Sequence, residues 1–224
     1  MWRILKAACF VVCPVLAVAY ALELVTLLNQ LPDNPRLQVL SVGFGAGVLA
    51  WGVLADKLSL WAVAEHELTH TLAALLFLQR VRAFAATDTG GITVTDGGKD
   101  IFVIGLAPYF LPTLALLWLP SLFLFRDRFQ FVAIFVLGLL LGYHALSNVR
   151  EFHSGQSDIQ RAGQAFSFLF CVAFSLICFG FVLAVGSYGS LDAGIHFLAH
   201  GSQVALAALM RLPRAMEECF GLAR

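Results

Sequence analysis

The stretch "LSLWAVAEHELTHTLAALLFLQ", residues 58–79, decides the fold. It is apolar at both ends and as long as the helix of about 20 residues that crosses a bilayer. Its middle carries two carboxylates and two imidazoles, on Glu65, His66, Glu67 and His70. Ionisable side chains at membrane depth cost free energy and usually serve a function. The stretch therefore predicts a membrane helix with a polar site inside it.

The composition of the whole chain also predicts a membrane protein. Of 224 residues, 60% are hydrophobic and 12% are charged, whereas about 25% are charged in a typical soluble domain. Lys and Arg together number 14, as do Asp and Glu, so no excess of charge indicates a nucleic-acid partner. The five cysteines form no C-x-x-C pair, and we interpret them as structural residues.

Six apolar segments are long enough to span a bilayer, at residues 7–28, 37–55, 59–79, 101–125, 129–148 and 162–187. They predict an all-α polytopic membrane protein, with one membrane domain over residues 1–190. We interpret the first segment as an uncleaved anchor, although its basic start leaves removal as a signal peptide open. Basic residues divide almost evenly between the two sides, so the orientation also stays open.

Two regions differ from spans and short loops. The insert at residues 81–98 contains β-prone runs at 81–87 and 92–95 around a Gly-Gly turn, which predicts a hairpin. At residues 191–224, polar side chains recur on one helical face, which predicts an amphipathic helix at the membrane interface. The polar residues of that face are Asp192, His196, His200, Gln203 and Arg211.

The order of residues in "HELTH" is that of the H-E-x-x-H zinc motif. On a helix, His66 and His70 lie four residues apart and share a face, with Glu67 beside the first histidine. Two neutral histidines can hold Zn²⁺, and the glutamate can take a proton from a water molecule. The alternative is a packed, hydrogen-bonded histidine pair without a metal. The depth of the motif in an apolar run favours one zinc ion per chain.

A catalytic zinc ion takes three protein ligands, so a third must come from elsewhere in the chain. Asp158 is a candidate because it lies in the polar stretch 153–163 and is predicted to open the sixth span. It also suits a structural role in the first turn of a helix capped by Ser157 and Gln160. These residues alone leave both interpretations open.

The chain resembles the site-2-type intramembrane zinc metallopeptidases over roughly residues 37–185. The resemblance rests on the membrane-embedded H-E-x-x-H, the β-prone insert, the Pro-containing span "GLAPYFLP" at 105–112, and the later aspartate in "QSDIQRAG". It implies that His66, His70 and Asp158 bind zinc and that Glu67 is catalytic. The chain departs from the family's N-x-x-P-x-x-x-x-D-G motif, since Asn148 precedes Asp158 without an intervening proline and Ile159 replaces the glycine.

These observations predict zinc-dependent intramembrane proteolysis of a transmembrane or membrane-proximal peptide, in a multi-pass protein of the bacterial inner (plasma) membrane. The alternative is a non-enzymatic scaffold or chaperone subunit of a partner complex, which keeps the metallopeptidase fold. The expected partners are a membrane protein or peptide substrate and the lipid bilayer, and no nucleic acid. The sequence does not specify residues that bind substrate.

Other polar residues have two interpretations each. Glu23 in the first span either supports the site or makes a helix contact. His144 and His153 either assist substrate or ligands or lie in a wet interface. His196 and His200 repeat the spacing of the zinc motif, but Phe197 stands where a catalytic glutamate would be. They predict a polar stripe rather than a second metal site.

Overall fold

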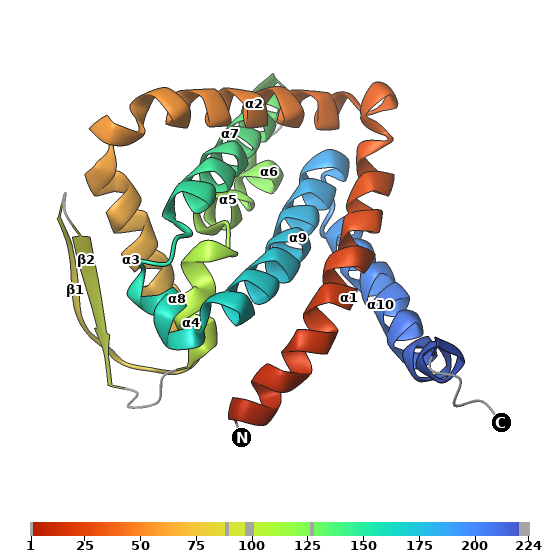
Figure 1. Ribbon diagram of the computed structural model, residues 1–224. Helices are drawn as coiled ribbons and strands as arrows, with labels where there is room; N and C mark the ends of the chain where they lie inside the picture. The colour runs from red at the N-terminus through yellow and green to blue at the C-terminus, as the bar shows by residue number, and fades with distance from the viewer. Residues whose placement is uncertain (1, 88–89, 97–100, 126–127, 220–224) are drawn as a thin grey trace.

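The computed structural model describes residues 2–87, 90–96, 101–125 and 128–219, which form long helices and a two-stranded hairpin (Figure 1). This confirms the predicted all-α polytopic class. The long helices are α1 (Trp2–Leu28), α2 (Pro35–Leu54), α3 (Ser59–Leu76), α7 (Arg128–Glu151), α9 (Gln164–Tyr188) and α10 (Leu191–Cys219). The short elements are the helices α4 (Phe102–Leu106), α5 (Thr113–Trp118), α6 (Ser121–Leu124) and α8 (Ser157–Ala162), the 3-10 turns η1 (Leu31–Asp33), η2 (Ala55–Lys57) and η3 (Ala107–Tyr109), and the strands β1 (Val81–Thr87) and β2 (Gly90–Thr95).

Five of the described helices are long and apolar enough to cross a membrane. They are α1, α2, α7, α9 and the Leu191–Leu212 part of α10. A sixth span is formed if the pair Phe102–Tyr109 and Thr113–Leu124, bent by 80°, counts as one broken helix. The number of spans agrees with the prediction, but the helices that qualify as spans differ from those predicted. Helix α3 does not pass this test, because its polar residues lower its hydropathy, whereas α10, predicted to lie at the interface, does pass it.

Helices α2 and α7 cross at glycines. A Cβ atom on Gly43 of α2 would lie 2.2 Å from the carbonyl oxygen of Phe135, and one on Gly142 of α7 would lie 2.1 Å from that of Phe44. Gly47 and Gly138 face the opposite backbone at similarly short distances. Small residues four apart allow two membrane helices to approach this closely. The crossing brings α7 close against α2, and the end of α7 reaches the polar residues of α3.

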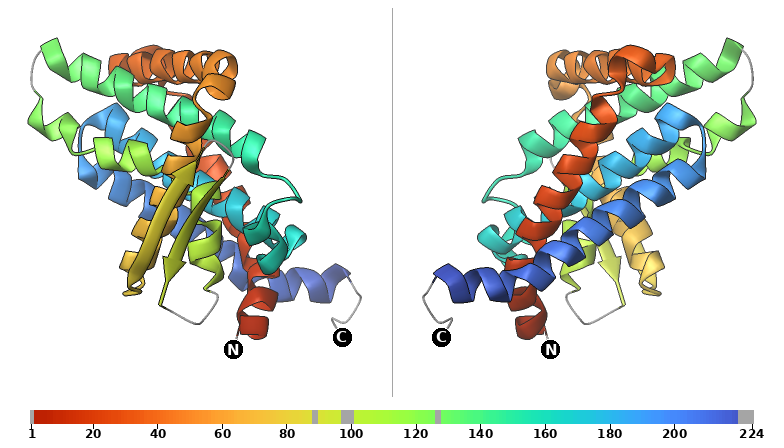
Figure 2. Two further views of the ribbon diagram at one scale, coloured as in Figure 1. Left: turned by 90° about the vertical axis from the view of Figure 1, so that its left-hand side faces the viewer. Right: turned by 90° about the vertical axis from the view of Figure 1, so that its right-hand side faces the viewer.

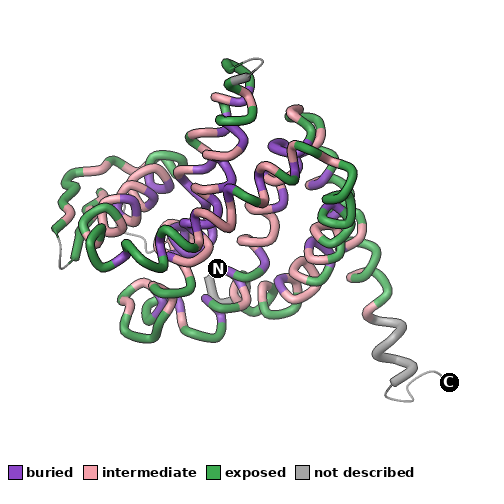
Figure 3. The backbone as a smooth tube through the Cα atoms, turned by 90° about the horizontal axis from the view of Figure 1, so that it is seen from above, coloured by how far each residue is buried: buried purple, intermediate pink, exposed green. Residues whose placement is uncertain are grey.

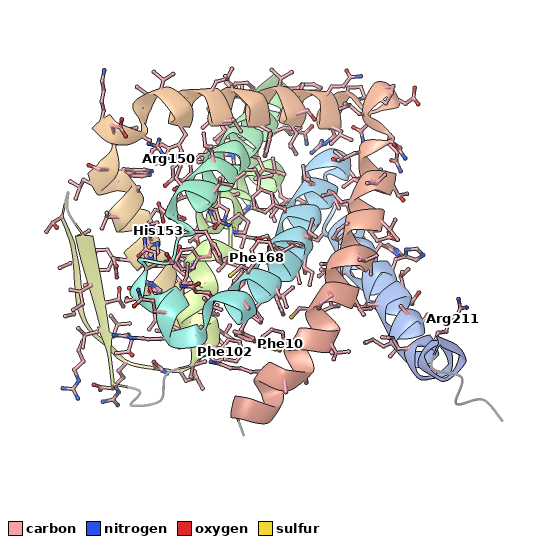
Figure 4. The ribbon with its side chains drawn as sticks, viewed as in Figure 1. Phe10, Phe102, Arg150, His153, Phe168 and Arg211 are labelled. Atoms are coloured by element: carbon pink, nitrogen blue, oxygen red, sulfur yellow. The ribbon has the colours of Figure 1, made fainter. Side chains whose placement is uncertain are left out.

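Helices α1 and α10 pack against α9 on the side away from the hairpin (Figure 1). Figure 4 shows Phe10 of α1 next to Phe102 of α4, and both rings pack on Phe166 of α9, with centroid distances of 6.2 Å and 4.9 Å. The Tyr20 hydroxyl bonds to the carbonyl of Leu198 at 2.8 Å and thereby joins α1 to α10. Seen from above, the buried residues gather toward the middle of the helical assembly (Figure 3).

The predicted hairpin is present and lies along α3 (Figure 2). Strands β1 and β2 pair antiparallel from Thr87 opposite Gly90 to Val81 opposite Thr95, with an irregularity between Val81 and Ala83. Thr93 of β2 contacts α3, because its hydroxyl donates to the backbone oxygen of Glu67 at 3.1 Å. The hairpin therefore covers the part of α3 that carries the zinc motif.

The segment around Asp158 differs from the prediction. Asp158 does not open the last span, because Gly163, with a φ of +98°, ends α8 and separates it from α9. The N-cap residue of α8 is Gln156, and no side chain caps this helix. The cap from Ser157, which belonged to the alternative interpretation, is therefore absent, and the side chain of Gln160 instead donates to the carbonyl of Ser154.

Candidate metal centre

Helix α3 presents His66 and His70 side by side, as the four-residue spacing requires. Their Nε2 atoms lie 3.2 Å apart, and their side chains are only 12% and 11% exposed. The opposite ring nitrogens are both held by other elements. Nδ1 of His66 lies 3.0 Å from a carboxylate oxygen of Glu151, and Nδ1 of His70 lies 2.9 Å from the carbonyl oxygen of Ile104. Because both partners accept hydrogen bonds, the neutral imidazoles carry their protons on Nδ1, and each Nε2 keeps its lone pair for a metal.

Asp158 reaches the same point from α8. Its Oδ2 lies 3.4 Å from Nε2 of His70. Gly105 of α4 lies next to this carboxylate, and a Cβ atom there would make an ordinary van der Waals contact with Oδ1 of Asp158 at 3.8 Å. Burial raises the pKa of Asp158, but the nearby His70, His66 and Arg161 side chains together lower it by more, so the net pKa lies below the ordinary value. The carboxylate form, which a metal requires, is therefore favoured at neutral pH.

The three side chains fit a zinc ion. The candidate ligand atoms of His66, His70 and Asp158 all lie within 4.8 Å of one another. In a tetrahedral zinc site with bonds near 2.05 Å, neighbouring ligand atoms are about 3.3 Å apart. The two separations that involve Nε2 of His70, 3.2 Å and 3.4 Å, match this spacing. Two imidazoles and one carboxylate leave a fourth position for water, as catalytic zinc sites do.

Glu67 is buried beside the two histidines and is held by the hairpin. It is 7% exposed, and its Oε2 accepts a hydrogen bond of 2.7 Å from the hydroxyl of Thr93. Gly91 of β2 packs directly against it, since a Cβ at Gly91 would lie 2.4 Å from Cγ of Glu67. The hairpin therefore fixes the conformation of the carboxylate that the sequence predicts to be catalytic.

A cleft of about 520 Å³ opens on this group. Glu67, His70 and Asp158 line it, and so do residues of β2, α4 and α8. Of the two strands, only β2 contributes residues to the cleft, so β2 forms its border. Two basic side chains, Lys6 and Arg161, also line the cleft, and Nζ of Lys6 donates to the carbonyl of Ala162 at 2.7 Å.

The sequence of the core of this fold matches a known family. The family model described as Peptidase M50B-like matches residues 39–189, which is about two thirds of the chain. The chain belongs to the Peptidase M50B-like family. This confirms the resemblance to site-2-type metallopeptidases and supports a metallopeptidase-like protein of the membrane. No curated protein and no solved structure is significantly similar to the chain.

The family match covers some helices of this M50B-like protein and leaves out others. It begins within α2 and ends at the end of α9, so α1 and α10 lie outside it. The four residues of the predicted site, His66, Glu67, His70 and Asp158, lie inside it. The structure brings all four to one cleft or to its immediate wall.

The other polar residues considered from the sequence are not part of this metal group. Glu23 of α1 pairs with Nδ1 of His200 of α10 at 2.7 Å, which is the helix contact considered for it. His196 is exposed, and among the described residues the one group of three or more His, Cys, Asp or Glu suited to a metal is the α3–α8 group. His144 is 4% exposed and packs against Phe179, outside the cleft. His153 is exposed in the loop after α7 (Figure 4).

Sequence reasoning missed Glu151 and the role of Thr93. Glu151 is the last residue of α7 and contacts His66 across 85 positions of sequence. Its one local signal is that an acid at a helix C-terminus is unfavourable for the helix dipole, so its presence there requires another reason. Thr93 carries no such signal, because threonine is common in strands.

Proposed function

We propose that this M50B-like protein is a zinc-dependent intramembrane peptidase that cleaves a transmembrane or membrane-proximal peptide. One observation carries the proposal: Nε2 of His66, Nε2 of His70 and a carboxylate oxygen of Asp158 converge beside the buried Glu67. A packed histidine pair has no need of an aspartate from α8 or of a carboxylate held by the hairpin. The donor set suits zinc, with one ion per chain.

The residues of the site divide the chemistry among them. His66, His70 and Asp158 would hold the ion, which when bound lowers the pKa of a water molecule toward 7 and polarises the scissile carbonyl. Glu67 accepts a proton from this water, so that the oxygen attacks the carbonyl carbon. When the C–N bond breaks, Glu67 returns the proton to the leaving nitrogen. The hydroxyl of Thr93 keeps the Glu67 carboxylate turned toward the cleft during both transfers.

The border of the cleft suggests how substrate is held. A substrate helix must unwind before attack, because its peptide bonds are hydrogen-bonded inside the membrane. An unwound segment can pair with a free strand edge. The backbone N–H of Asp96 donates to the carbonyl of Arg80, so the next pair, Val81 and Thr95, is a non-hydrogen-bonded pair of the ladder. The backbone groups of Thr95 therefore point away from β1, on the edge that borders the cleft.

The decisive experiment uses the full-length protein in liposomes with a panel of transmembrane peptides. We expect Glu67→Gln to lower the cleavage rate about 10²- to 10⁴-fold, the usual contribution of general acid–base catalysis, while zinc remains near one per chain. Glu65→Gln is the matched control, because Glu65 is an adjacent buried acid of the same helix that lies outside the candidate metal group.

Unchanged cleavage by the Glu67→Gln protein would rule out the proposed mechanism. Wild-type protein that binds zinc but cleaves no peptide would instead support a scaffold or chaperone subunit that keeps the family fold. We place the protein in the bacterial inner membrane as part of the same proposal, since its helices suit a multi-pass location.

A further inference from the structure

The two histidines of the candidate centre are supported in different ways. Nδ1 of His70 faces a neutral backbone carbonyl at 2.9 Å, whereas Nδ1 of His66 faces a carboxylate at 3.0 Å. A carboxylate accepts a stronger hydrogen bond than a carbonyl and increases the electron density on the opposite ring nitrogen. The support of His66 is therefore the stronger of the two.

Glu151 is itself fixed in place. One of its carboxylate oxygens faces His66, and the other accepts a hydrogen bond of 2.8 Å from the hydroxyl of Ser147, one turn earlier on α7. Ser147 is 4% exposed, and the Glu151 side chain is 27% exposed. Both oxygens are thus engaged, and α7 packs backbone to backbone against α2 at its glycines. The carboxylate cannot turn away from His66 without losing a second hydrogen bond.

We propose that Glu151 is a positioning residue for the metal centre. It holds His66 as the tautomer with the proton on Nδ1, so that the lone pair of Nε2 faces His70 and Asp158. Ser147 holds Glu151 in the orientation that this requires. The inference rests on the proposed function, because positioning His66 matters only if the site binds a metal ion. It assigns Glu151 no contact with substrate.

The alternative is that the contact between Glu151 and His66 has a purely structural role. In that case Glu151 and His66 would simply link α7 to α3, and their loss would lower stability without changing metal affinity in the folded protein. A nearby ion pair provides the comparison. Arg150, the residue before Glu151, pairs with Asp56 at 3.1 Å and links α7 to the turn η2, with no histidine involved.

The test measures zinc affinity in the full-length, detergent-solubilised protein by competition with a chelator of known affinity. We expect Glu151→Ala to bind zinc about 10- to 100-fold more weakly, the usual effect of losing a carboxylate behind a metal-bound histidine. Glu151→Gln, which is nearly the same size, should show a smaller loss in the same direction. Arg150→Gln should bind zinc as the wild type does.

Substitution of cobalt for zinc gives a second measurement, whose result would not change if Glu151 had only a structural role. The visible absorption of Co²⁺ reports its ligands, and we expect it to change in Glu151→Gln protein whose thermal unfolding matches the wild type. Equal zinc affinity and an equal cobalt spectrum in wild type and both Glu151 variants would overturn this inference alone. A wild-type protein that binds no zinc would overturn the proposed function, and this inference with it.

Discussion

Helices α3 and α10 both carry two histidines four residues apart, yet their surroundings differ. In α3, the residue after the first histidine is Glu67, which is buried beside the cleft. In α10 the corresponding residue is Phe197, which is buried against Tyr20 with a ring distance of 5.5 Å. The position that holds the candidate catalytic carboxylate in α3 serves helix packing in α10. Spacing alone therefore does not make a metal site.

The second difference lies in what other elements bring to each pair. Three elements, α4, α7 and α8, direct acceptors at the imidazoles of α3. Among the described residues, the one acid that pairs with His200 of α10 is Glu23 of α1, and the His200 side chain is 63% exposed. A zinc ion requires several ligand atoms at one point, because each ligand must replace a water molecule in the coordination shell of the ion. The α3 pair meets this requirement, and the α10 pair does not.

The largest expected effect on zinc affinity comes from removing the third candidate ligand, Asp158. Asp158→Ala should lower zinc affinity by more than the roughly 100-fold upper range seen when a supporting residue is lost, because a direct ligand is removed. Asp192→Ala and His196→Ala are matched changes on α10 and should leave zinc near one per chain. Metal analysis of the three purified proteins measures this. A fully loaded Asp158→Ala protein beside an empty α10 variant would reverse the comparison.

A smaller effect is expected from the hairpin, which accompanies α3 and has no counterpart on α10. Thr95→Pro removes a backbone N–H from the edge of β2, so peptide cleavage should fall several-fold if substrate pairs there. Thr95→Val keeps this N–H and is the control. Zinc content and thermal unfolding should stay at wild-type values in both proteins. We choose Thr95 because a change at Thr93 would also release Glu67. Equal cleavage by both variants would show that the edge does not hold substrate.

The smallest effect concerns the pair between α1 and α10. His200→Ala should reduce stability by about 0.6 kcal/mol, the average for a polar contact between membrane helices. Zinc affinity should not change, because this pair lies outside the candidate metal group. Unfolding in mixed micelles, followed together with metal analysis, tests both points. A loss of zinc in this variant would mean that α1 and α10 support the metal centre after all.

The sequence alone determined those features that depend on short-range rules. Composition predicted the membrane fold, and the Gly-Gly turn between β-prone runs predicted the hairpin. The helical repeat placed His66 and His70 on one face, because residues four apart are neighbours on any α-helix. The choice of Asp158 came from resemblance to a family, since its residues also allowed a capping role.

Only the tertiary structure decided which distant groups meet at that face. Asp158 reaches His70 because Gly163 breaks the chain into α8 and α9, so that the short α8 turns its carboxylate toward α3. Glu151 reaches His66 because glycines let α2 and α7 touch backbone to backbone, which sets where α7 ends. Such contacts join residues 85 or more positions apart. No local pattern records them, because they depend on how whole helices pack.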